Sequence, residues 1–314
     1  MGVKPGTRVA LAILVAALYA TCYSAIKAAL PLAPPLRFAA LRAAVAGVTV
    51  LVIVAALRQP LLPPRRLWPG VAALGLAGTS VAFGAMFLSL ERSGAGLASV
   101  LGNTTPLLVI VLAALVLKER VTPSKGVALA LGFAGTALIG LGGSEGTGWS
   151  GLAGAAIPLI AATANATENV LVKKLDAGSA VLRVAAWQLL VGSVPLFVLS
   201  VWLETGARIV WGPTFLGFLA LVAVLGTAVA TSRWYRLVQS DDVGRLSLYL
   251  FLIPVLGLAL ASALFRERLG RTEMTGIALA IAGIGWAMRE SLRDPLPTVL
   301  EGSHGVGEER RTGF

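Results

Sequence analysis

The sequence predicts an all-α integral membrane protein with ten transmembrane helices, arranged as two inverted five-helix repeats. The first supporting observation is composition, because 57% of the 314 residues are hydrophobic and only 13% are charged. In soluble domains roughly 25% of the residues are charged. The other two observations are a series of apolar segments long enough to cross a bilayer and a residue pattern that occurs twice along the chain.

Composition also excludes several classes of function. The single cysteine, Cys22, rules out a disulfide framework. The single histidine, His304, lies in the polar C-terminal segment, which argues against metal sites and catalytic triads built on histidine. The net charge of +11 comes from Lys and Arg residues spread through short loops, as is typical of membrane topology signals. We therefore expect a lipid bilayer as the environment, with no metal, cofactor or nucleic acid.

The first apolar segment follows a short basic start, as a cleaved signal peptide would. Its apolar run continues to about Ala29 without a clear small-residue cleavage site, so we interpret it as the first spanning helix. Pro, Gly and charged residues separate the segments that follow, and these residue types interrupt or end helices. The predicted spans are residues 9–29, 36–57, 68–90, 97–117, 125–141, 152–172, 181–202, 214–233, 246–265 and 273–288.

Basic residues predict the orientation of these spans. With a cytoplasmic N-terminus, most Lys and Arg residues fall in the inside segments, and both termini lie in the cytoplasm. We expect a multi-pass protein of a bacterial inner (plasma) membrane. The polar segment from residue 291 to residue 314 is expected to be a disordered cytoplasmic tail.

A pattern of residues recurs at a spacing of 148 positions. Pro106 and Pro254 have this spacing, and the Gly78-Thr79 pair has the same spacing from Gly226-Thr227. The Lys118-Glu119-Arg120 corner recurs as Arg266-Glu267-Arg268. We place the first repeat at residues 1–143 and the second at residues 144–290. Because each repeat has five helices, the second copy must cross the bilayer in the opposite sense, an arrangement typical of alternating-access transporters.

The pattern also resembles a known family. The segment SAIKAALPLAPPLRFAALRAAVAG, residues 24–47, looks like the first helix pair of the EamA family in the drug/metabolite transporter superfamily. The order of Pro106, Lys118-Glu119-Arg120 and Gly135, followed by its second copy, is similar to that family as well. The resemblance implies ten helices, an inverted five-plus-five repeat and transport of small metabolites. Members of the family export amino acids or related compounds.

Arg42 is the sharpest functional signal, because it lies about 9 Å inside the second span at 1.5 Å per residue. A charge at that depth should face a cavity or a partner. It could hold a substrate carboxylate, or it could bind the carbonyl groups of a neighbouring helix. Gln188 occupies the corresponding position of the second repeat, 146 residues later, and would be a neutral hydrogen-bonding counterpart.

Glu168 is the one acidic residue that the sequence places inside a span. If it is buried, it could carry a proton during a transport cycle. The alternative is a solvated ion pair with Lys173 or with a nearby helix.

Polar residues at mid-depth complete the candidate substrate site. Asn103 and Thr104 precede Pro106, whose ring breaks the helix and frees a carbonyl group. Asn165 and Asn169 share a helix face, and their counterparts in the first repeat are Tyr19 and Tyr23. Helix–helix hydrogen bonding is the alternative role for these groups. The predicted set is Arg42, Tyr19, Tyr23, Asn103, Thr104, Asn165, Asn169, Trp187, Gln188 and Tyr249, with Glu168 for proton coupling and Pro106 and Pro254 as helix breaks.

These residues support the hypothesis of a secondary transporter that exports small polar metabolites such as amino acids, by alternating access at a central cavity between the repeats. No nucleotide-binding P-loop motif is present. A passive channel or a lipid- or drug-handling protein is the alternative. An enzyme is disfavoured, because no catalytic motif lies within a span and Asp241-Asp242 is better explained as a helix cap beside Arg245. One chain is sufficient for such a cycle, since both repeats lie within it.

Overall fold

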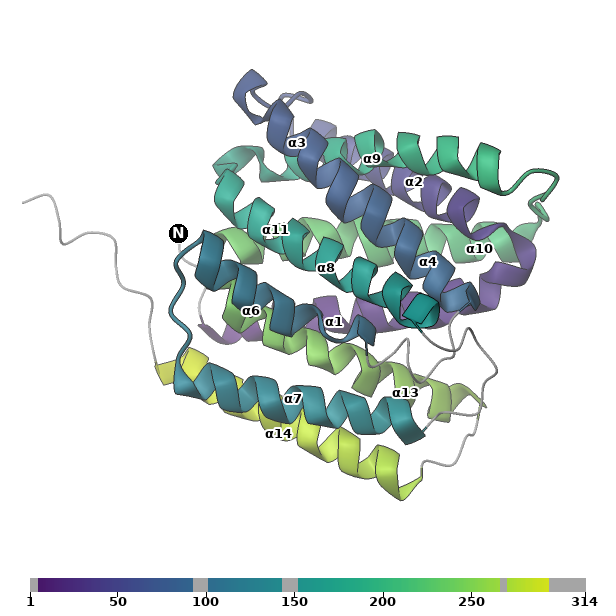
Figure 1. Cartoon of the computed structure of the whole chain (residues 1–314). Coiled ribbons are helices and arrows are strands. Elements are labelled where there is room, and N and C mark those ends of the chain that lie inside the picture. The colour runs from purple at the N-terminus through teal and green to yellow at the C-terminus, as the bar shows by residue number, and fades with distance from the viewer. Residues whose placement is uncertain (1–4, 93–100, 143–151, 266–269, 294–314) are drawn as a thin grey trace, which may run out of the picture.

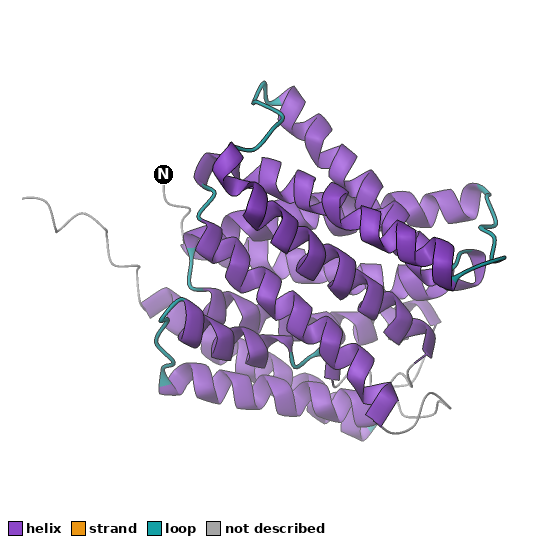
Figure 2. Cartoon of the chain, turned by 45° about the horizontal axis from the view of Figure 1, so that its top comes forward, coloured by secondary structure: helices purple, strands orange, loops and turns teal. Residues whose placement is uncertain are grey.

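The computed structural model describes residues 5–92, 101–142, 152–265 and 270–293. Every regular element in these residues is a helix and none is a strand, which confirms the predicted all-α class (Figure 2). The corner at residues 266–268, the predicted boundary between the repeats and residues 294–314 of the predicted tail lie outside the described residues, whereas residues 291–293 of that tail are helical.

The described helices follow the ten predicted spans. Seven spans contain one principal helix each, although the first residues of the fourth span lie outside the described residues, and the third, eighth and ninth are composite. The single helices are α1 (Pro5–Ala29), α2 (Pro35–Ala56), α6 (Thr105–Val116), α7 (Pro123–Gly142), α8 (Leu152–Leu175), α9 (Val181–Leu203) and α14 (Arg271–Arg293). The composite spans are α3 (Trp68–Leu74) with η3 (Gly75–Val81) and α4 (Ala82–Arg92), α10 (Pro213–Ala220) with η5 (Leu221–Val229) and α11 (Ala230–Ser240), and α12 (Val243–Ser247) with η6 (Leu248–Phe251) and α13 (Leu252–Phe265).

Length and composition show that this is a multi-pass membrane fold. Five helical stretches are long and apolar enough to cross a bilayer, and shorter apolar helices accompany them. Large apolar side chains also remain uncovered by the protein, including Leu115 at 74% and Trp202 at 77% exposure. Such uncovered apolar surface is stable when lipid chains surround it.

Equivalent helices of the two repeats make equivalent contacts. Figure 1 shows α7 and α14 side by side along one edge of the bundle, while α2 packs against α9 elsewhere. In the first repeat α1 packs on η5 and α13, and in the second repeat α8 packs on η3 and α6. This pattern of exchanged partners is expected of a pseudo-two-fold axis between inverted repeats.

Glycines explain the close pairing of α7 with α14. A methyl group built on Gly135 would lie 2.5 Å from the Ala280 backbone nitrogen, and one on Gly283 would lie 2.8 Å from the Ala128 carbonyl oxygen. The two helix backbones therefore approach each other through positions that tolerate no side chain.

Irregular helical segments precede both prolines that the sequence marks as helix breaks. The helix that contains residues 101–102 gives way to a turn at Asn103-Thr104, and α6 then begins at Thr105 with Pro106 in its first turn. In the second repeat the 3₁₀ segment η6 precedes α13, in which Pro254 is the third residue. The Ser247 hydroxyl lies 3.5 Å from the Pro106 carbonyl oxygen, so the two broken regions meet inside the protein.

Candidate functional site

Two π-helices occupy equivalent places in the repeats and carry the buried polar residues. They are η3 and η5, and the Gly78-Thr79 pair in the first corresponds to Gly226-Thr227 in the second. All four residues are buried. π-Helical turns are rare and are frequently found at functional sites. Two helices of the other repeat pack on each π-helix, α8 and α9 on η3 and α1 and α2 on η5, which produces two related clusters.

The Arg42 cluster comprises Arg42, Thr227, Cys22 and Phe83. The Arg42 Nε donates a hydrogen bond of 2.7 Å to the Thr227 hydroxyl, which in turn donates to the Val222 carbonyl, 2.8 Å away. The guanidinium carbon lies 4.5 Å from the centre of the Phe83 ring, within the range of a cation–π contact. Arg42 is only 4% exposed, yet its Nη1 has no hydrogen-bond partner among the described residues.

The Glu168 cluster comprises Glu168, Gln188, Thr79 and Tyr235. The Thr79 hydroxyl donates to the Gln188 Oε1 at 2.6 Å, which is the counterpart of the Arg42–Thr227 bond. The Tyr235 hydroxyl donates to the Glu168 Oε1, also at 2.6 Å. Arginine and cysteine at one π-helix therefore correspond to glutamine and glutamate at the other.

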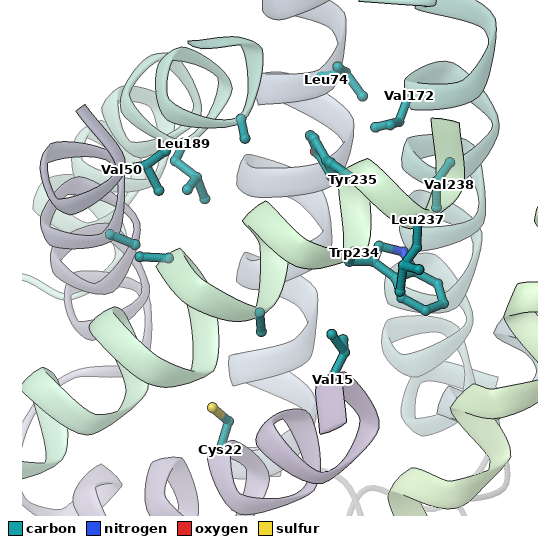
Figure 3. Packing of buried hydrophobic residues seen from close by; sticks show 14 of the residues in the cluster. Val15, Cys22, Val50, Leu74, Val172, Leu189, Trp234, Tyr235, Leu237 and Val238 are labelled. Atoms are coloured by element: carbon teal, nitrogen blue, oxygen red, sulfur yellow. The ribbon is translucent and has the colours of Figure 1, made fainter. Parts of the chain in front are cut away.

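The glycine of each π-helix allows these side chains to approach the backbone. A methyl group built on Gly78 would overlap the Glu168 carboxyl group, and one built on Gly226 would overlap the Cys22 sulfur. Figure 3 shows Cys22 projecting from α1 and Tyr235 on α11, near Leu74 and Val172. Because Glu168 and Cys22 are 146 positions apart, they are equivalent residues in equivalent contacts.

Glu168 and Lys173, which the sequence offers as an ion pair, have different partners in the structure. The partner of Glu168 is Tyr235, while the Lys173 Nζ donates to the carbonyl groups of Gln239 and Asp241. Positions five apart on an α-helix are about 140° apart around its axis, so Glu168 and Lys173 point in different directions. The Glu168–Lys173 ion pair is therefore not formed.

Tyr19 links the two clusters. Its side chain is half-buried, interacts with the Thr231 side chain, and lies within electrostatic reach of both Glu168 and Arg42. Tyr23 lies one turn further along α1, is 38% exposed, and is close enough to Arg42 to feel its charge. The structure thus brings Arg42, Tyr19, Tyr23, Gln188 and Glu168 into one region.

The predicted asparagines of α8 are engaged within the protein. Asn169 is buried, and its Oδ1 accepts a hydrogen bond of 2.6 Å from the Trp234 indole. Its Nδ2 donates to the Asn165 carbonyl, and the Asn165 Nδ2 donates to the Ala161 carbonyl. These bonds correspond to the alternative role that the sequence left open, hydrogen bonding between and within helices.

The remaining predicted residues have other surroundings along the chain. Trp187 donates its indole N–H to the Leu61 carbonyl at 2.9 Å and packs edge-on against Trp68. The Thr104 hydroxyl donates to the Leu101 carbonyl in the turn that follows Gly102 and Asn103. Tyr249 is buried in η6, near the meeting point of the two broken regions. None of the hydrogen bonds described above joins one of these three residues to Arg42 or Glu168.

Sequence reasoning missed Thr79, Thr227, Phe83 and Tyr235. The recurrence of Gly-Thr at a spacing of 148 was the available signal for the two threonines. It indicated a repeat but not a site, because a threonine within an apolar segment usually bonds to its own helix. Tyr235 and Phe83 lie on helices adjacent in space but distant in sequence from their partners, so no local pattern identifies them.

Charged groups gather at one end of the bundle, on the turn that joins α11 to α12. The Glu119 carboxylate accepts hydrogen bonds from the backbone N–H groups of Val243 and Gly244, at 3.0 and 3.1 Å. The Asp242 Oδ1 accepts from the Arg245 N–H at 2.7 Å, which confirms the predicted helix cap. The Lys125 Nζ lies 2.7 Å from the Asp242 Oδ2. Since Glu119 and Lys125 belong to the first repeat, these bonds fasten the two repeats together at residues 241–244.

Burial and hydrogen bonding shift the pKa values of the Glu119 and Asp242 carboxyl groups in opposite directions. Burial and the neighbouring Asp242 raise the pKa of the Glu119 carboxyl, although two backbone N–H groups act against this. Burial would raise the pKa of Asp242 too, but hydrogen bonds from Lys125 and from the Arg245 N–H outweigh it and hold that pKa below its usual range. The Asp242 carboxyl group therefore ionises more readily than that of Glu119.

The fold is that of a multi-pass, all-helical membrane protein in which paired π-helices lie beside a buried arginine and a half-buried glutamate. The model of the EamA-like transporter family matches residues 7–141 and 152–289, so the chain belongs to this family. Its members are transporters, which confirms the resemblance seen in the sequence and the expectation that the protein is not an enzyme.

Several relatives are similar over most of the chain. The uncharacterized transporter YvbV of Bacillus subtilis is 30% identical over 249 residues, which cover 79% of this chain and 81% of the relative. A probable amino-acid metabolite efflux pump of Escherichia coli is 28% identical over 201 residues, or 60% of this chain and 66% of the relative. A solved crystal structure with 20% identity has a TM-score of 0.76 and covers 90% of this chain and 98% of its own, which supports the fold.

Proposed function

We propose that this transporter exports small polar metabolites of the amino-acid class, by alternating access at a central site between the two repeats. Arg42 carries the proposal. It is a buried guanidinium with an unpaired Nη1, and no described residue offers it a carboxylate. An uncompensated charge inside a membrane protein is strongly unfavourable, so intramembrane charges usually serve a ligand or a partner.

A substrate carboxylate would satisfy Arg42. The Nε is already committed to Thr227, and the Phe83 ring limits the movement of the guanidinium plane. The free Nη1 is the group that would donate to an anionic oxygen. Binding would then depend on one charge-assisted hydrogen bond and on the electrostatic attraction of a poorly solvated cation.

The Glu168 cluster would receive the other end of an amphoteric substrate. Gln188 and Glu168 together offer an amide and a carboxylate, whose second oxygen is not used by Tyr235. A substrate ammonium group or a transported proton would suit that carboxylate. Tyr19, which feels the charges of both Arg42 and Glu168, would form a wall between the two ends, with Tyr23 beside Arg42.

The joint at residues 241–244 supports the alternating-access part of the proposal. Glu119 and Lys125 fasten one end of the bundle across the interface between the repeats. We assign this end to the cytoplasm, together with both termini, in the bacterial inner membrane. Opening the cycle to the cytoplasm would require these bonds to break together.

Two relatives support the substrate class and the outward direction. The proteins of Escherichia coli and Salmonella typhimurium that match this chain are each described as a probable amino-acid metabolite efflux pump. The similarity to these two proteins covers about 60% of this chain and does not by itself assign a substrate to the chain. The chemistry of the two clusters is an independent reason to expect a small amphoteric compound.

Counterflow in proteoliposomes tests the proposal. The full chain would be reconstituted with an internal pool of unlabelled amino acid, and uptake of the same labelled compound would be followed without an imposed gradient. Accelerated exchange of one compound is expected, since a carrier shows saturation and counterflow and a pore shows neither. Silence across a panel of amino acids and related amphoteric metabolites would overturn the substrate class, and linear, non-saturating flux would overturn the carrier mechanism.

A further inference from the structure

A polar pocket of about 300 Å³ lies at one end of the bundle, away from the two clusters. Three chain segments that are distant in sequence line it: the end of α2, the η4 turn (Gly178–Ala180) with the start of α9, and the end of α11. The lining residues are Gln59, Gly178, Ser179, Val181, Leu182, Arg236 and Gln239.

Two glutamines in this pocket have unsatisfied buried atoms. The Gln59 Oε1, an acceptor, and the Gln239 Nε2, a donor, are both buried and have no hydrogen-bond partner among the described residues. More than nine in ten buried polar groups are hydrogen-bonded in well-determined structures. A hydroxyl group can donate to one of these atoms and accept from the other, because it carries both functions.

The charge of the pocket is positive. Arg236 is the charged residue in the lining, which includes no Asp or Glu, and the Ser179 hydroxyl adds a donor. Arg233 lies one turn earlier on α11 and adds its positive charge at a short distance. A phosphate group is the ligand that suits a guanidinium and a neighbouring hydroxyl.

The pocket also lies at the level where lipid headgroups are expected. Gln59 follows the C-terminal end of α2, and Gln239 is one residue from the end of α11. Leu61 and Leu62, directly after Gln59, are 47% and 58% exposed. The Trp187 indole binds the Leu61 carbonyl, and tryptophans are enriched at membrane–water interfaces.

We propose that this pocket binds the headgroup of an anionic phospholipid that carries hydroxyl groups, such as a glycerol phosphate headgroup. The phosphate contacts Arg236 and Ser179, and a headgroup hydroxyl bridges Gln59 and Gln239. Basic pockets between transmembrane helices are known to hold anionic lipid headgroups. This site is separate from the substrate site and does not depend on the substrate proposed above.

Native mass spectrometry of the full chain tests this inference. The protein would be released from mixed micelles that contain phosphatidylglycerol and phosphatidylcholine in equal amounts. We expect phosphatidylglycerol to be retained at least about fivefold over phosphatidylcholine, a ratio that corresponds to about 1 kcal/mol. Arg236→Gln should remove this preference, and Gln59→Leu should weaken it. Arg233→Gln is the matched control, because it removes the same charge from the same helix without altering the lining, and it should reduce the preference less than Arg236→Gln does.

Three outcomes would overturn the inference. The first is equal retention of the two lipids by the unaltered protein, and the second is an unchanged preference in the Arg236→Gln variant. The third is thermal stabilisation by soluble sn-glycerol 1-phosphate that matches the effect of the lipid, which would assign the pocket to a soluble phosphate ester instead. A melting curve of each variant without added lipid confirms that the fold is retained.

Discussion

The Arg42 cluster and the Glu168 cluster are equivalent in geometry and different in chemistry. In each, a polar residue of α2 or α9 bonds to the threonine of a π-helix, and a residue of α1 or α8 fills the space above the adjacent glycine. One cluster carries a guanidinium with a thiol, and the other carries an amide with a carboxyl group. The comparison teaches that one repeated backbone arrangement can hold two chemically different sets of side chains; in the proposed function, one set receives an anionic group and the other receives a cation or a proton.

The largest effect is expected when this difference is removed. Arg42→Gln would give the first cluster the same residue as the second, and the substrate would lose a charge-assisted hydrogen bond of about 1.5–3 kcal/mol. Binding should weaken by about 10- to 100-fold, measured as the half-saturating concentration in counterflow. Unaltered counterflow in a folded, monodisperse Arg42→Gln protein would remove Arg42 from the substrate site. Gln188→Ala serves as the comparison at the neutral position and should have the smaller effect.

Glu168→Gln tests whether the second cluster carries a proton. The substitution retains the acceptor for Tyr235 but removes the ability to ionise. The transport rate of the variant should vary less with pH than that of the unaltered protein, in a series from pH 5 to 8. Tyr235→Phe is the control, since it removes the hydrogen bond and keeps the carboxyl group, and its pH dependence should persist. An identical pH profile in the Glu168→Gln protein would exclude a proton-carrying role.

A glycine substitution tests how closely the side chains pack in the Arg42 cluster. Gly226→Ala would place a methyl group on the Cys22 sulfur, and overpacking of this kind is expected to destabilise the fold by about 1–3 kcal/mol. The double variant Gly226→Ala/Cys22→Ala should regain most of this loss, because the second change removes the overlapping atom. Thermal unfolding in detergent measures both. A double variant as unstable as Gly226→Ala would show that another contact causes the loss.

The threonines of the π-helices provide a finer comparison. Thr227→Val removes an acceptor from a charged group, a loss of about 1.5–3 kcal/mol, whereas Thr79→Val removes a neutral bond of about 0.5–1.5 kcal/mol. The midpoint of unfolding should therefore fall further for Thr227→Val. Thr227→Ser and Thr79→Ser keep the hydroxyl groups and are the matched controls. Equal losses would indicate that the Arg42 bond contributes no more than a neutral one.

The smallest effect is expected at the joint at residues 241–244. A variant there tests whether charged groups outside the two clusters also contribute to the stability of the contact between the repeats. The pKa of Asp242 is held below its usual value of about 4, so its charged form stabilises the folded protein above that pH. Asp242→Asn should lower the free energy of unfolding by about 1 kcal/mol at pH 7. The difference from the unaltered protein should shrink as the pH falls through the folded-state pKa, in unfolding curves measured from pH 7 to 3. A difference independent of pH would assign the loss to packing.

Much of the fold could be predicted from the sequence, because a helix that crosses a bilayer needs a long apolar segment and hydropathy shows such segments directly. Apolar length located the spans, and Pro106 and Pro254 located the breaks, since a proline removes a backbone bond wherever it falls. The π-helices could not be predicted in this way. A single turn of η3 or η5 has the same hydropathy whether it is α or π, and its hydrogen-bond pattern depends on neighbours such as Arg42 and Gln188.

The site was only partly predictable for a related reason. Arg42, Gln188 and Glu168 were identifiable because a charge or an amide inside a span requires a partner. The partners themselves, Thr227, Thr79 and Tyr235, come from distant helices whose rotation about their axes the sequence does not specify. Trp187 was expected at the site because of its depth in a span, but its position at one end of α9 depends on the fold of residues 61–68.

The π-helices at equivalent places in the two repeats also bear on how the chain arose. An unusual turn at the same place in both halves is most simply explained if it existed before one gene segment was copied and joined to the other. In an assembly of two identical half-length chains, any mutation at one cluster would appear at the other as well. Within a single chain the two halves can differ, so Arg42 has a glutamine as its equivalent at position 188, and Glu168 has a cysteine as its equivalent at position 22.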